Sequence, residues 1–511
     1  MIVGEIVSFI KNDEKFSIKE YERFIDSYGL KEVWETLCSI MKTEGIKFFN
    51  KKVVNFYDIG RLYEIGLARE NKYSKKECGK YYTPLDVSFV MAQLLAEDGE
   101  IPSLADTGCG CGNLIIEVLK IVHERSQDEF NNLLDKIYLF DLDETALKIC
   151  VCRIESLFNV NLTNRIHITK GDFLKKTVKL PNGIYVIANP PYSQIKETEQ
   201  YSDLTALNES KDLYIGFIEK IISKCKKAVI VSPQSFIVGV KFNKIREKLI
   251  KEFEGEIFSF DNVPGTLFDG RKEGVFNTNT ANGVRASITK LTKSDNPGFR
   301  LTHLIRFKSI ERKRVITLKY LKDQLGCRKQ NLKRPIKCFR ELEDFVYPII
   351  EKEHYFIEDL VELDESRQDE KMALHINSSA RYFIVCSKTK LDRNGSFTIY
   401  AKNIDSLRIL YALMNSSYAY LWWRMFDGGI LLPKNLLLAI PVPQSLCLSE
   451  QINSLCDKLI KREKDFFVYK KNANKLQQSI KFPDEYRKEL NQLLFGNEVN
   501  LDIIHKNTET I

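Results

Sequence analysis

Two patterns that direct a chain into or across a membrane are missing from this sequence. No stretch approaches the about 18 consecutive apolar residues of a transmembrane helix. The first residues, Met1 to Glu5, lack the basic region that precedes the apolar core of a signal peptide. We therefore expect no membrane association and a location in the cytoplasm.

The sequence also lacks the cysteine spacing of a zinc site. None of its 12 cysteines forms a C-x-x-C pair, and the two C-x-C pairs, Cys109/Cys111 and Cys150/Cys152, lie in segments that have another explanation. We expect free, buried thiols in a reducing compartment. No bound metal is expected, and a zinc site is the minor alternative.

What is present is an alternation of apolar runs and helix-like segments in the middle of the chain. With 511 residues, of which 44% are hydrophobic, the chain is long enough for two or three domains. Strands that alternate with helices favour an α/β fold with a doubly wound, mostly parallel sheet of seven strands. The seven runs cover residues 103–106, 137–141, 166–170, 184–188, 228–232, 257–261 and 284–291.

The segments outside this alternation differ in composition. Residues 1–75 have the apolar spacing of helices, the sheet is expected within residues 76–300, and residues 301–446 mix short strands with aromatic residues. Residues 447–511 are rich in Lys and predict further helices. Within the sheet domain, residues 193–211 are polar, and their apolar residues have no regular spacing. This pattern predicts a mobile loop.

A glycine-rich turn follows the first predicted strand. Gly108, Gly110 and Gly112 are spaced G-x-G-x-G, whereas dinucleotide-binding turns have the spacing G-x-G-x-x-G. Asp106 ends the strand before the turn, where a carboxylate would repel a pyrophosphate but attract an ammonium group. The helix N-terminus after the turn favours a carboxylate. A ligand that carries both groups fits this site, such as the methionine part of S-adenosylmethionine.

Acidic residues also end the next two predicted strands. Asp141 ends the second strand, where an acid in such folds accepts hydrogen bonds from ribose hydroxyls. Asp172 and Phe173 follow the third strand, and they could accept from an adenine amino group and stack on its ring. Acids at three successive strand ends favour one common site over three unrelated loop residues.

The fourth predicted strand ends in Asn189, Pro190, Pro191 and Tyr192. Two consecutive prolines cannot donate to a ladder of hydrogen bonds, so these residues lie at the carboxyl end of the strand, where open α/β sheets bind ligands. The Asn189 amide oxygen and the Pro190 carbonyl form a pair of acceptors that suits an exocyclic NH2 group. Tyr192 offers a flat face on which a base can stack.

A helix with a sharply defined start is expected before the first strand. Thr83 can serve as its N-cap, Pro84 fits the first turn, and Asp86 completes a capping box. The backbone N–H groups at the tip of such a helix have no partner within the helix.

Positive charge is concentrated in one segment of the chain. Residues 306–340 contain thirteen Lys and Arg against two acids, an excess of +11, whereas the whole chain carries +8. Such a segment is suited to the phosphates of a nucleic acid. A solvated helix face is the alternative interpretation.

The order of these motifs resembles that of the gamma-class N6-adenine DNA methyltransferases of bacterial type II restriction-modification systems. The motifs lie at residues 80–84, 106–112, 141, 172–173, 189–192 and 212–214, and the basic segment follows them. The resemblance covers residues 58–290 with specific motifs and is looser over 300–445. It implies a Rossmann-like methyltransferase sheet, followed by a mixed α+β domain at 301–446 that recognises the DNA target.

The resemblance implies transfer of a methyl group from S-adenosylmethionine to N6 of an adenine that is flipped out of double-stranded DNA. It also implies that the methylation protects this DNA from a cognate restriction endonuclease, in a bacterial cytoplasm and close to the nucleoid. The residues that resemble the family's cofactor site are Tyr82, Thr83, Pro84, Asp106, Gly108, Gly110, Asp141, Asp172 and Phe173.

The catalytic motif of the family resembles Asn189, Pro190 and Tyr192, and Phe268 resembles the aromatic residue on the other face of the extruded base. The residues expected to contact DNA are Arg312, Lys313, Arg314, Arg328 and Lys329. Two positions depart from the family pattern: Thr107 replaces a frequent Pro, and Asp212 follows an unusually long polar stretch, which leaves its role open.

Other functions stay open at this point. The chain could be the modification subunit of a multi-subunit restriction enzyme, or it could methylate ribosomal RNA or a protein glutamine. The glycine spacing counts against a nicotinamide-dependent dehydrogenase, and the complete motif set counts against an inert DNA-binding protein. The chain has no Pro-Cys pair, which argues against C5-cytosine methylation.

Overall fold

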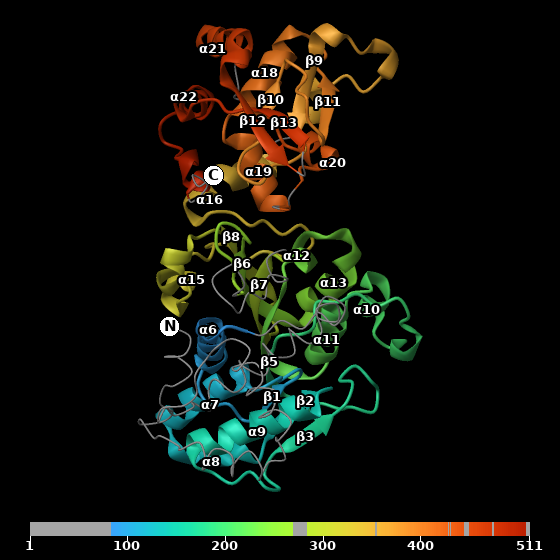
Figure 1. Ribbon diagram of the computed structural model, residues 1–511, viewed down its shortest axis with the longest axis vertical. Coiled ribbons are helices and arrows are strands. Elements are labelled where there is room, and N and C mark those ends of the chain that lie inside the picture. Colours follow the sequence, from blue (N-terminus) through green and yellow to red (C-terminus); the bar gives the residue numbers. More distant parts are fainter. Residues whose placement is uncertain are drawn as a thin grey trace. The chain divides into compact units, whose positions relative to one another are not determined.

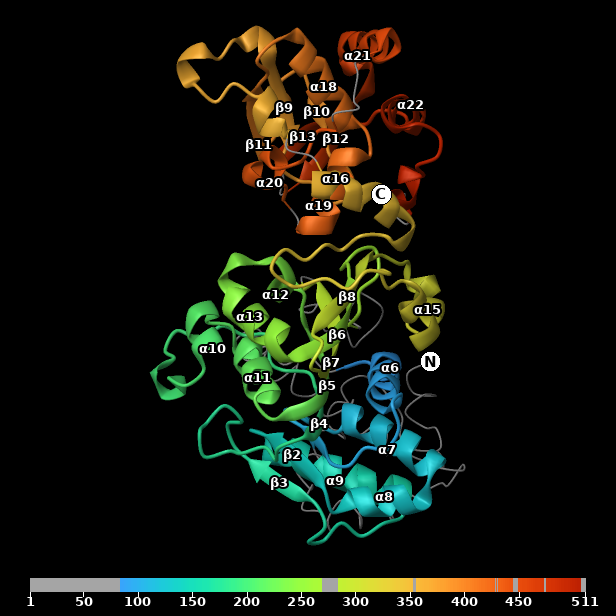
Figure 2. The ribbon, with the colours of Figure 1, turned by 180° about the vertical axis from the view of Figure 1, so that it is seen from behind.

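The computed structural model describes residues 83–268, 284–352, 355–427, 429, 431–443, 449–472 and 475–506. The predicted helical segment 1–75 and Tyr82 lie outside these ranges. The chain divides into two compact units (Figures 1 and 2). Of the described residues, unit 1 contains those up to Arg300 together with 307–323 and 329–334, and unit 2 contains 301–306, 324–328 and those from Pro335 onward.

The largest sheet among the described residues has eight strands in the order β3-β2-β1-β4-β5-β7-β6-β8. Seven of these strands lie in unit 1, and the division into units falls within β8, after Arg300. Strands β3 to β5 in this order pair in parallel, whereas β7 is antiparallel to both β5 and β6. The strands are β1 Leu104–Asp106, β2 Ile137–Asp141, β3 His167–Lys170, β4 Ile184–Ala188, β5 Cys225–Pro233, β6 Phe253–Phe260, β7 Ala286–Lys293 and β8 Gly298–Ile305.

Each of the seven predicted apolar runs corresponds to one of these strands, but the predicted count of seven is one too low. The missing strand is β8, which the predicted domain boundary at residue 300 divides. That boundary was predicted where the alternation of helix and strand stops. β8 follows β7 through a short connection without a helix, so it produces no such alternation.

The strand order reverses between β1 and β4, which are neighbours at the centre of the sheet. The chain continues from β1 toward β2 on one side and from β4 toward β5 on the other. In open α/β sheets the crevice at such a point, outside the carboxyl ends of the strands, is the usual ligand site. The glycine-rich turn follows β1, and Asn189 follows β4.

Both faces of the central sheet are covered. Ala228, Val229, Ile230 and Val231 on β5 are buried in succession, although neighbouring side chains of a strand point to opposite faces. The helices of unit 1 are α6 Leu85–Ala96, α7 Asn113–Arg125, α8 Gln127–Leu134, α9 Glu144–Phe158, α10 Thr205–Ser210, α11 Leu213–Ile222, α12 Ser235–Val238, α13 Asn243–Glu252, α14 Arg312–Val315 and α15 Leu318–Asp323. None of the helices in the described ranges is long and apolar enough to cross a membrane.

The polar stretch 193–211 is structured, which corrects the prediction of a mobile loop. It contains a 3-10 turn at Glu199–Tyr201 and the helix α10. Leu204 and Leu207 are buried. The few apolar residues of the stretch suffice to pack it against unit 1, and its polar side chains form hydrogen bonds that a periodicity cannot reveal.

Unit 2 is a mixed α+β structure. Its strands form a three-stranded sheet and a two-stranded hairpin. The strands are β9 Ala373–Asn377, β10 Cys386–Ser387, β11 Ser396–Tyr400, β12 Phe467–Asn472 and β13 Lys475–Ile480. The helices are α16 Glu343–Lys352, α17 Ile357–Leu360, α18 Ile404–Asn415, α19 Tyr418–Phe426, α20 Lys434–Leu438, α21 Glu450–Arg462 and α22 Asp484–Phe495.

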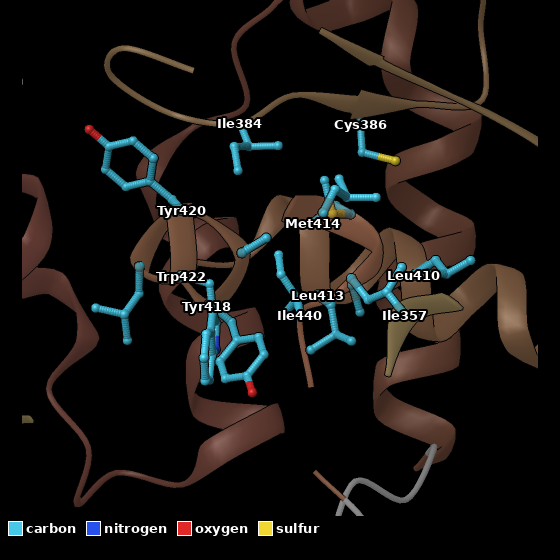
Figure 3. Close-up of a cluster of buried hydrophobic side chains, with 14 of the residues drawn as sticks. Ile357, Ile384, Cys386, Leu410, Leu413, Met414, Tyr418, Tyr420, Trp422 and Ile440 are labelled. Carbon is cyan, nitrogen blue, oxygen red and sulfur yellow. The ribbon is translucent and has the colours of Figure 1, made fainter. Parts of the chain in front are cut away.

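A large hydrophobic core lies within unit 2. Figure 3 shows Tyr418 and Trp422 beside Leu413 and Ile440, and the rings of Tyr418 and Trp422 lie 5.9 Å apart. The same core includes residues of α21 and α22, so the predicted boundary between 446 and 447 does not separate two domains. The apolar faces of these helices complete the core of residues 335–443. The β12–β13 hairpin also interrupts the predicted helical segment.

Candidate functional site

A cavity of about 510 Å³ lies at the carboxyl ends of β1, β2, β3 and β4. This volume is in the range of small-molecule and cofactor sites. Residues from all four strand ends line it, as do Ser193, Gln194, Ile195 and Tyr201 from the stretch after β4. Among the predicted site residues, the cavity wall contains Thr83, Gly108, Gly110, Asp141, Asp172, Phe173 and Asn189.

The glycine-rich turn after β1 forms the wall nearest to the centre of the sheet. Gly108 and Gly110 line the cavity, and Gly112 precedes α7 with φ +89°. A Cβ atom on Gly112 would lie 2.6 Å from the Sγ of Cys150. Both the left-handed backbone and the close approach of this side chain therefore favour glycine at that position.

Asp106 lies behind this wall and does not line the cavity. Its side chain is fully buried, and its Oδ1 accepts a hydrogen bond from the Gly108 N–H at 3.4 Å. Its Oδ2 has no hydrogen-bond partner among the described residues. Burial, the largest effect, raises the pKa of the Asp106 carboxyl to about 8. Thr107, the position of the departure from Pro, lines the cavity beside it.

Asp141 connects the end of β2 to the glycine-rich turn. Its Oδ2 accepts from the Gly110 N–H at 2.9 Å, and its Oδ1 accepts from the Asp143 N–H at 2.9 Å. Each carboxylate oxygen has two acceptor positions, so both oxygens can accept a further hydrogen bond. Because Asp141 lines the cavity, its carboxylate is available to a hydroxyl group of a ligand.

Asp172 and Phe173 form the opposite part of the wall. Asp172 Oδ1 accepts from the Leu174 N–H at 2.9 Å, and Oδ2 accepts from the hydroxyl of Tyr201 at 2.6 Å. Phe173 is buried, and the Nζ of Lys220 lies 4.9 Å from its ring centre. Tyr201 was not among the predicted site residues. Its one signal in the sequence is that it is the only aromatic residue between positions 193 and 211.

Asn189 lines the cavity directly after β4, and its orientation is fixed by Thr83. The Nδ2 group of Asn189 donates to the Thr83 Oγ1 at 3.0 Å, across 106 positions of sequence. This bond directs the amide oxygen away from Thr83. Pro190 is buried and is not part of the cavity wall.

The predicted capping role of Thr83 is wrong. Helix α6 begins at Leu85 after Pro84, and no side chain caps it. The Thr83 hydroxyl binds Asn189, and its carbonyl accepts from the Asn113 Nδ2 at 3.2 Å. The polar groups of Thr83 thus bind Asn189 and Asn113, which are distant in sequence, and do not bind the N–H groups of α6.

Tyr192, three positions after Asn189, has two further aromatic rings as neighbours. Tyr192 is 5.9 Å from Phe268 at an interplanar angle of 67°, and 6.4 Å from Tyr214 at 76°. A base between two parallel rings needs a spacing of about 7–8 Å, twice an aromatic contact distance. Tyr192 and Phe268 are thus neighbours, but a base can lie between them only after one ring rotates.

Most of the predicted DNA-contacting cations have carboxylate partners. Arg314 pairs with Glu311 at 2.9 Å, Arg328 with Glu351 at 3.2 Å and Lys329 with Glu254 at 2.8 Å. Arg312 pairs with Asp86 at 2.6 Å and also donates to the carbonyls of Thr266 and Leu267. Lys313 is exposed. The local charge excess therefore overstates the positive charge that this segment presents to a ligand.

The role of Asp212, which the sequence left open, follows from its contacts. It precedes α11, accepts from the Gln194 Nε2 at 3.2 Å and forms an ion pair with Lys241. These contacts close the stretch that follows Asn189. Asp212 therefore has a structural position at the neck of that stretch and does not line the cavity.

Comparison with known proteins identifies the segment that carries this site. Residues 55–272 match a protein-family model. The matched family is N-6 DNA Methylase. The N-6 DNA Methylase match contains the glycine-rich turn, the acids at the strand ends, Asn189 and Phe268.

Two curated relatives align with part of the chain. The chain is 32% identical over 155 residues to the type II methyltransferase M.VspI of Vibrio sp., covering 30% of this chain and 34% of that protein. It is 23% identical over 189 residues to the methylase subunit of the type I restriction enzyme MpnII of Mycoplasma pneumoniae, covering 35% of this chain and 34% of that protein. The chain thus spans about a third of the length of the curated relatives it matches.

Among solved structures, the chain aligns with a nuclease-deletion mutant of the Type ISP restriction-modification enzyme LlaGI in complex with a DNA substrate mimic. The TM-score is 0.44 at 13% sequence identity, and the alignment covers 88% of this chain and 64% of that chain.

Proposed function

We propose that this chain is an S-adenosylmethionine-dependent methyltransferase that modifies N6 of adenine in double-stranded DNA as part of a restriction-modification system. The observation that carries the proposal is the position of the Asn189 amide. It lines the same cavity as the glycine-rich turn after β1, and Thr83 fixes its orientation. The N-6 DNA Methylase match and the two curated relatives support the same activity.

The residues of the cavity fit the cofactor. Asp141 has acceptor positions for ribose hydroxyls, and Asp172 has one for an adenine amino group. The buried Oδ2 of Asp106 lacks a hydrogen-bond partner among the described residues, directly behind Gly108. Its carboxylate would compensate the positive charge of an amino acid ammonium group. When bound, the cofactor supplies a methyl group on a sulfonium sulfur.

Asn189 would act on the nucleophile. The lone pair of the adenine N6 is delocalised into the ring, so the amino group is a weak nucleophile. The Asn189 Oδ1 and the Pro190 carbonyl would accept its two hydrogens and draw the nitrogen toward tetrahedral geometry. Bound S-adenosylmethionine would supply the methyl group and leave as S-adenosylhomocysteine, and one N6 proton would go to solvent because an amide oxygen is too weak a base to keep it.

The aromatic residues would hold the target base. Taking a base out of the duplex costs a few kcal/mol. Stacking on an aromatic ring returns about 1–3 kcal/mol per base, and Tyr192, three positions after Asn189, would take this role. Phe268, the neighbour of Tyr192, would cover the second face after a ring rotation.

Substitution of Asn189 tests the function. We expect Asn189→Ala to lower methyl transfer to DNA by about 100-fold or more, because a positioned polar group that acts on the reacting atom is removed. Binding of S-adenosylhomocysteine should persist. Tritiated cofactor and a mixture of DNA, RNA and protein acceptors measure the transfer and its acceptor class. Asn182→Ala, at an exposed turn outside the cavity, is the matched control.

Equal activity in the two variants contradicts the catalytic role of Asn189. Label in ribosomal RNA or in protein, with none in DNA, favours the alternative acceptors.

A second candidate is the modification subunit of a multi-subunit restriction enzyme. It is favoured by the similarity to the type I methylase subunit of Mycoplasma pneumoniae. The two candidates differ in whether the purified chain methylates specific sites alone or only with a recognition partner. Sequencing of N6-methyladenine in DNA from cells that express this chain alone distinguishes them. A cognate endonuclease is expected to act on the same site in either case.

A further inference from the structure

We propose that Tyr201 is a positioning residue that orients the Asp172 carboxylate toward the base of the cofactor and so selects a 6-aminopurine over a 6-oxopurine. This inference rests on the proposed function. It concerns the stretch of residues 195–211, here called the cavity loop, whose sequence is polar and without a period.

The cavity loop is closed at its neck by backbone hydrogen bonds. The Ile195 N–H donates to the Lys211 carbonyl at 2.9 Å, and the Leu213 N–H donates to the Ser193 carbonyl at 3.0 Å. The side-chain bond from Gln194 to Asp212 lies between them. The two ends of the loop are therefore fixed beside each other, and the loop returns to its starting point as a compact unit.

The body of the cavity loop is fixed by contacts that do not involve Tyr201. Leu204 and Leu207 are buried, and the Glu219 carboxylate accepts from the Ala206 N–H at 2.9 Å and the Leu207 N–H at 3.2 Å. Glu219 belongs to α11, which packs on the sheet. Removal of the Tyr201 hydroxyl should therefore leave the loop in place.

Tyr201 extends from this loop to the cavity wall. Its hydroxyl donates to Asp172 Oδ2 at 2.6 Å, a length typical of a bond to a charged acceptor. Burial, with the neighbouring Asp172 carboxylate, raises the pKa of Tyr201 well above its ordinary value, so its hydroxyl retains the donated proton. The Leu174 N–H binds the other oxygen. The carboxylate is thus held at both oxygens and cannot rotate freely.

The Asp172 carboxylate held in this way offers a ligand acceptor positions and no donor. Each oxygen of Asp172 has two acceptor positions, and each uses one of them within the protein. The remaining positions suit an NH2 group, whereas the carbonyl of a 6-oxopurine would meet a negatively charged oxygen. The preference depends on the direction of the carboxylate, and Tyr201 supplies one of the two bonds that set this direction.

The test compares the binding of two probes, S-adenosylhomocysteine and S-inosylhomocysteine, by calorimetry. We expect the unmodified chain to prefer the adenosyl compound. Tyr201→Phe should weaken its binding roughly fivefold, the effect of about one hydrogen bond, with little change for the inosyl compound. Tyr185→Phe, which removes a hydroxyl from β4 outside the cavity wall, should leave both affinities unchanged.

A double-substitution cycle with Asp172→Asn shows whether Tyr201 acts through Asp172. The effect of Tyr201→Phe should disappear in the Asp172→Asn background. Unchanged selectivity in Tyr201→Phe overturns the inference, and tighter adenosyl binding overturns it as well, because Tyr201 would then compete with the base. Failure of the unmodified chain to bind either probe is a different result, since it contradicts the proposed cofactor and hence the proposed function.

Discussion

Among single residues, Asp106 illustrates how the fold changes the chemistry of a side chain. An exposed aspartate ionises near pH 3.8, but burial in this position raises the pKa to about 8, although the Gly108 N–H bond opposes the shift. In the cofactor-free protein the carboxyl group is therefore largely protonated at neutral pH. A cationic ligand group beside it would favour the ionised form.

This shift predicts a pH-dependent stability. The folded state binds a proton that the unfolded state releases above its own pKa of 3.8. The stabilising contribution is full below that pH and is lost as the pH rises through about 8. The free energy of unfolding should fall by up to about 1.4 kcal/mol per pH unit in this window. Chemical denaturation between pH 5 and 9 measures this slope.

Asp106→Asn should remove this part of the slope, because an amide does not titrate. Asp295→Asn, in an exposed turn, should retain it. A slope that is the same in Asp106→Asn and in the unmodified chain would show that the carboxyl group is already ionised in the folded protein.

Among the elements, α14 has a structural role that its basic sequence conceals. Arg312 connects it to α6 through Asp86, with bonds of 2.6 and 2.8 Å, and to the carbonyls of Thr266 and Leu267 just before Phe268. These bonds place α14 beside the aromatic residues of the site. A guanidinium group, with its several donors, suits four such bonds at once.

We expect Arg312→Ala to lower the free energy of unfolding by about 1–3 kcal/mol, because partly buried acceptors lose a charged donor. Its neighbour Lys313 is exposed, and Lys313→Ala should change stability by less than about 0.5 kcal/mol. Urea denaturation of both variants makes the comparison. Similar values for the two would mean that the ion pair with Asp86 contributes little.

At the scale of the whole molecule, the basic segment 306–340 is divided between the two units. Residues 307–323 and 329–334 belong to unit 1, and the remainder belongs to unit 2. Its cations also pair with acids from elsewhere in each unit, as Lys329 does with Glu254. A count of charge along the chain therefore cannot define a DNA-binding surface.

The structure sharpens the test of DNA binding by this segment. Neutralising Lys313 and Arg314, which are exposed, should reduce the slope of log K against log salt by up to about 1.8, or about 0.9 for each phosphate that is no longer neutralised. Arg312 is excluded from this test because its substitution affects folding. Lys224→Ala, at the amino end of β5, is the control. An unchanged slope in the double variant would place the DNA-binding surface elsewhere.

Much of the fold and part of the site could be predicted from local sequence. Ile184–Ala188 is a strand because its apolar residues are consecutive, and it ends before Asn189 because two prolines follow that residue. The glycine-rich turn and the acids Asp141 and Asp172 lie at one sheet edge for the same kind of reason, since parallel strands bring their carboxyl ends together. The prediction of Asp106 as a cavity residue was less complete, because burial behind Gly108 is not visible in a motif.

The sequence by itself determined the strands, their ends and the chemical groups that follow them, because these depend on neighbouring residues. Only the tertiary structure decided which of those groups meet. Thr83 binds Asn189 across 106 positions of sequence, and Arg312 binds Asp86 across 226. Tyr201, which lies in a polar stretch, binds Asp172. Hydrophobic periodicity reports which face of an element is buried, but the partner of a polar side chain is chosen by the segments that packing brings beside it.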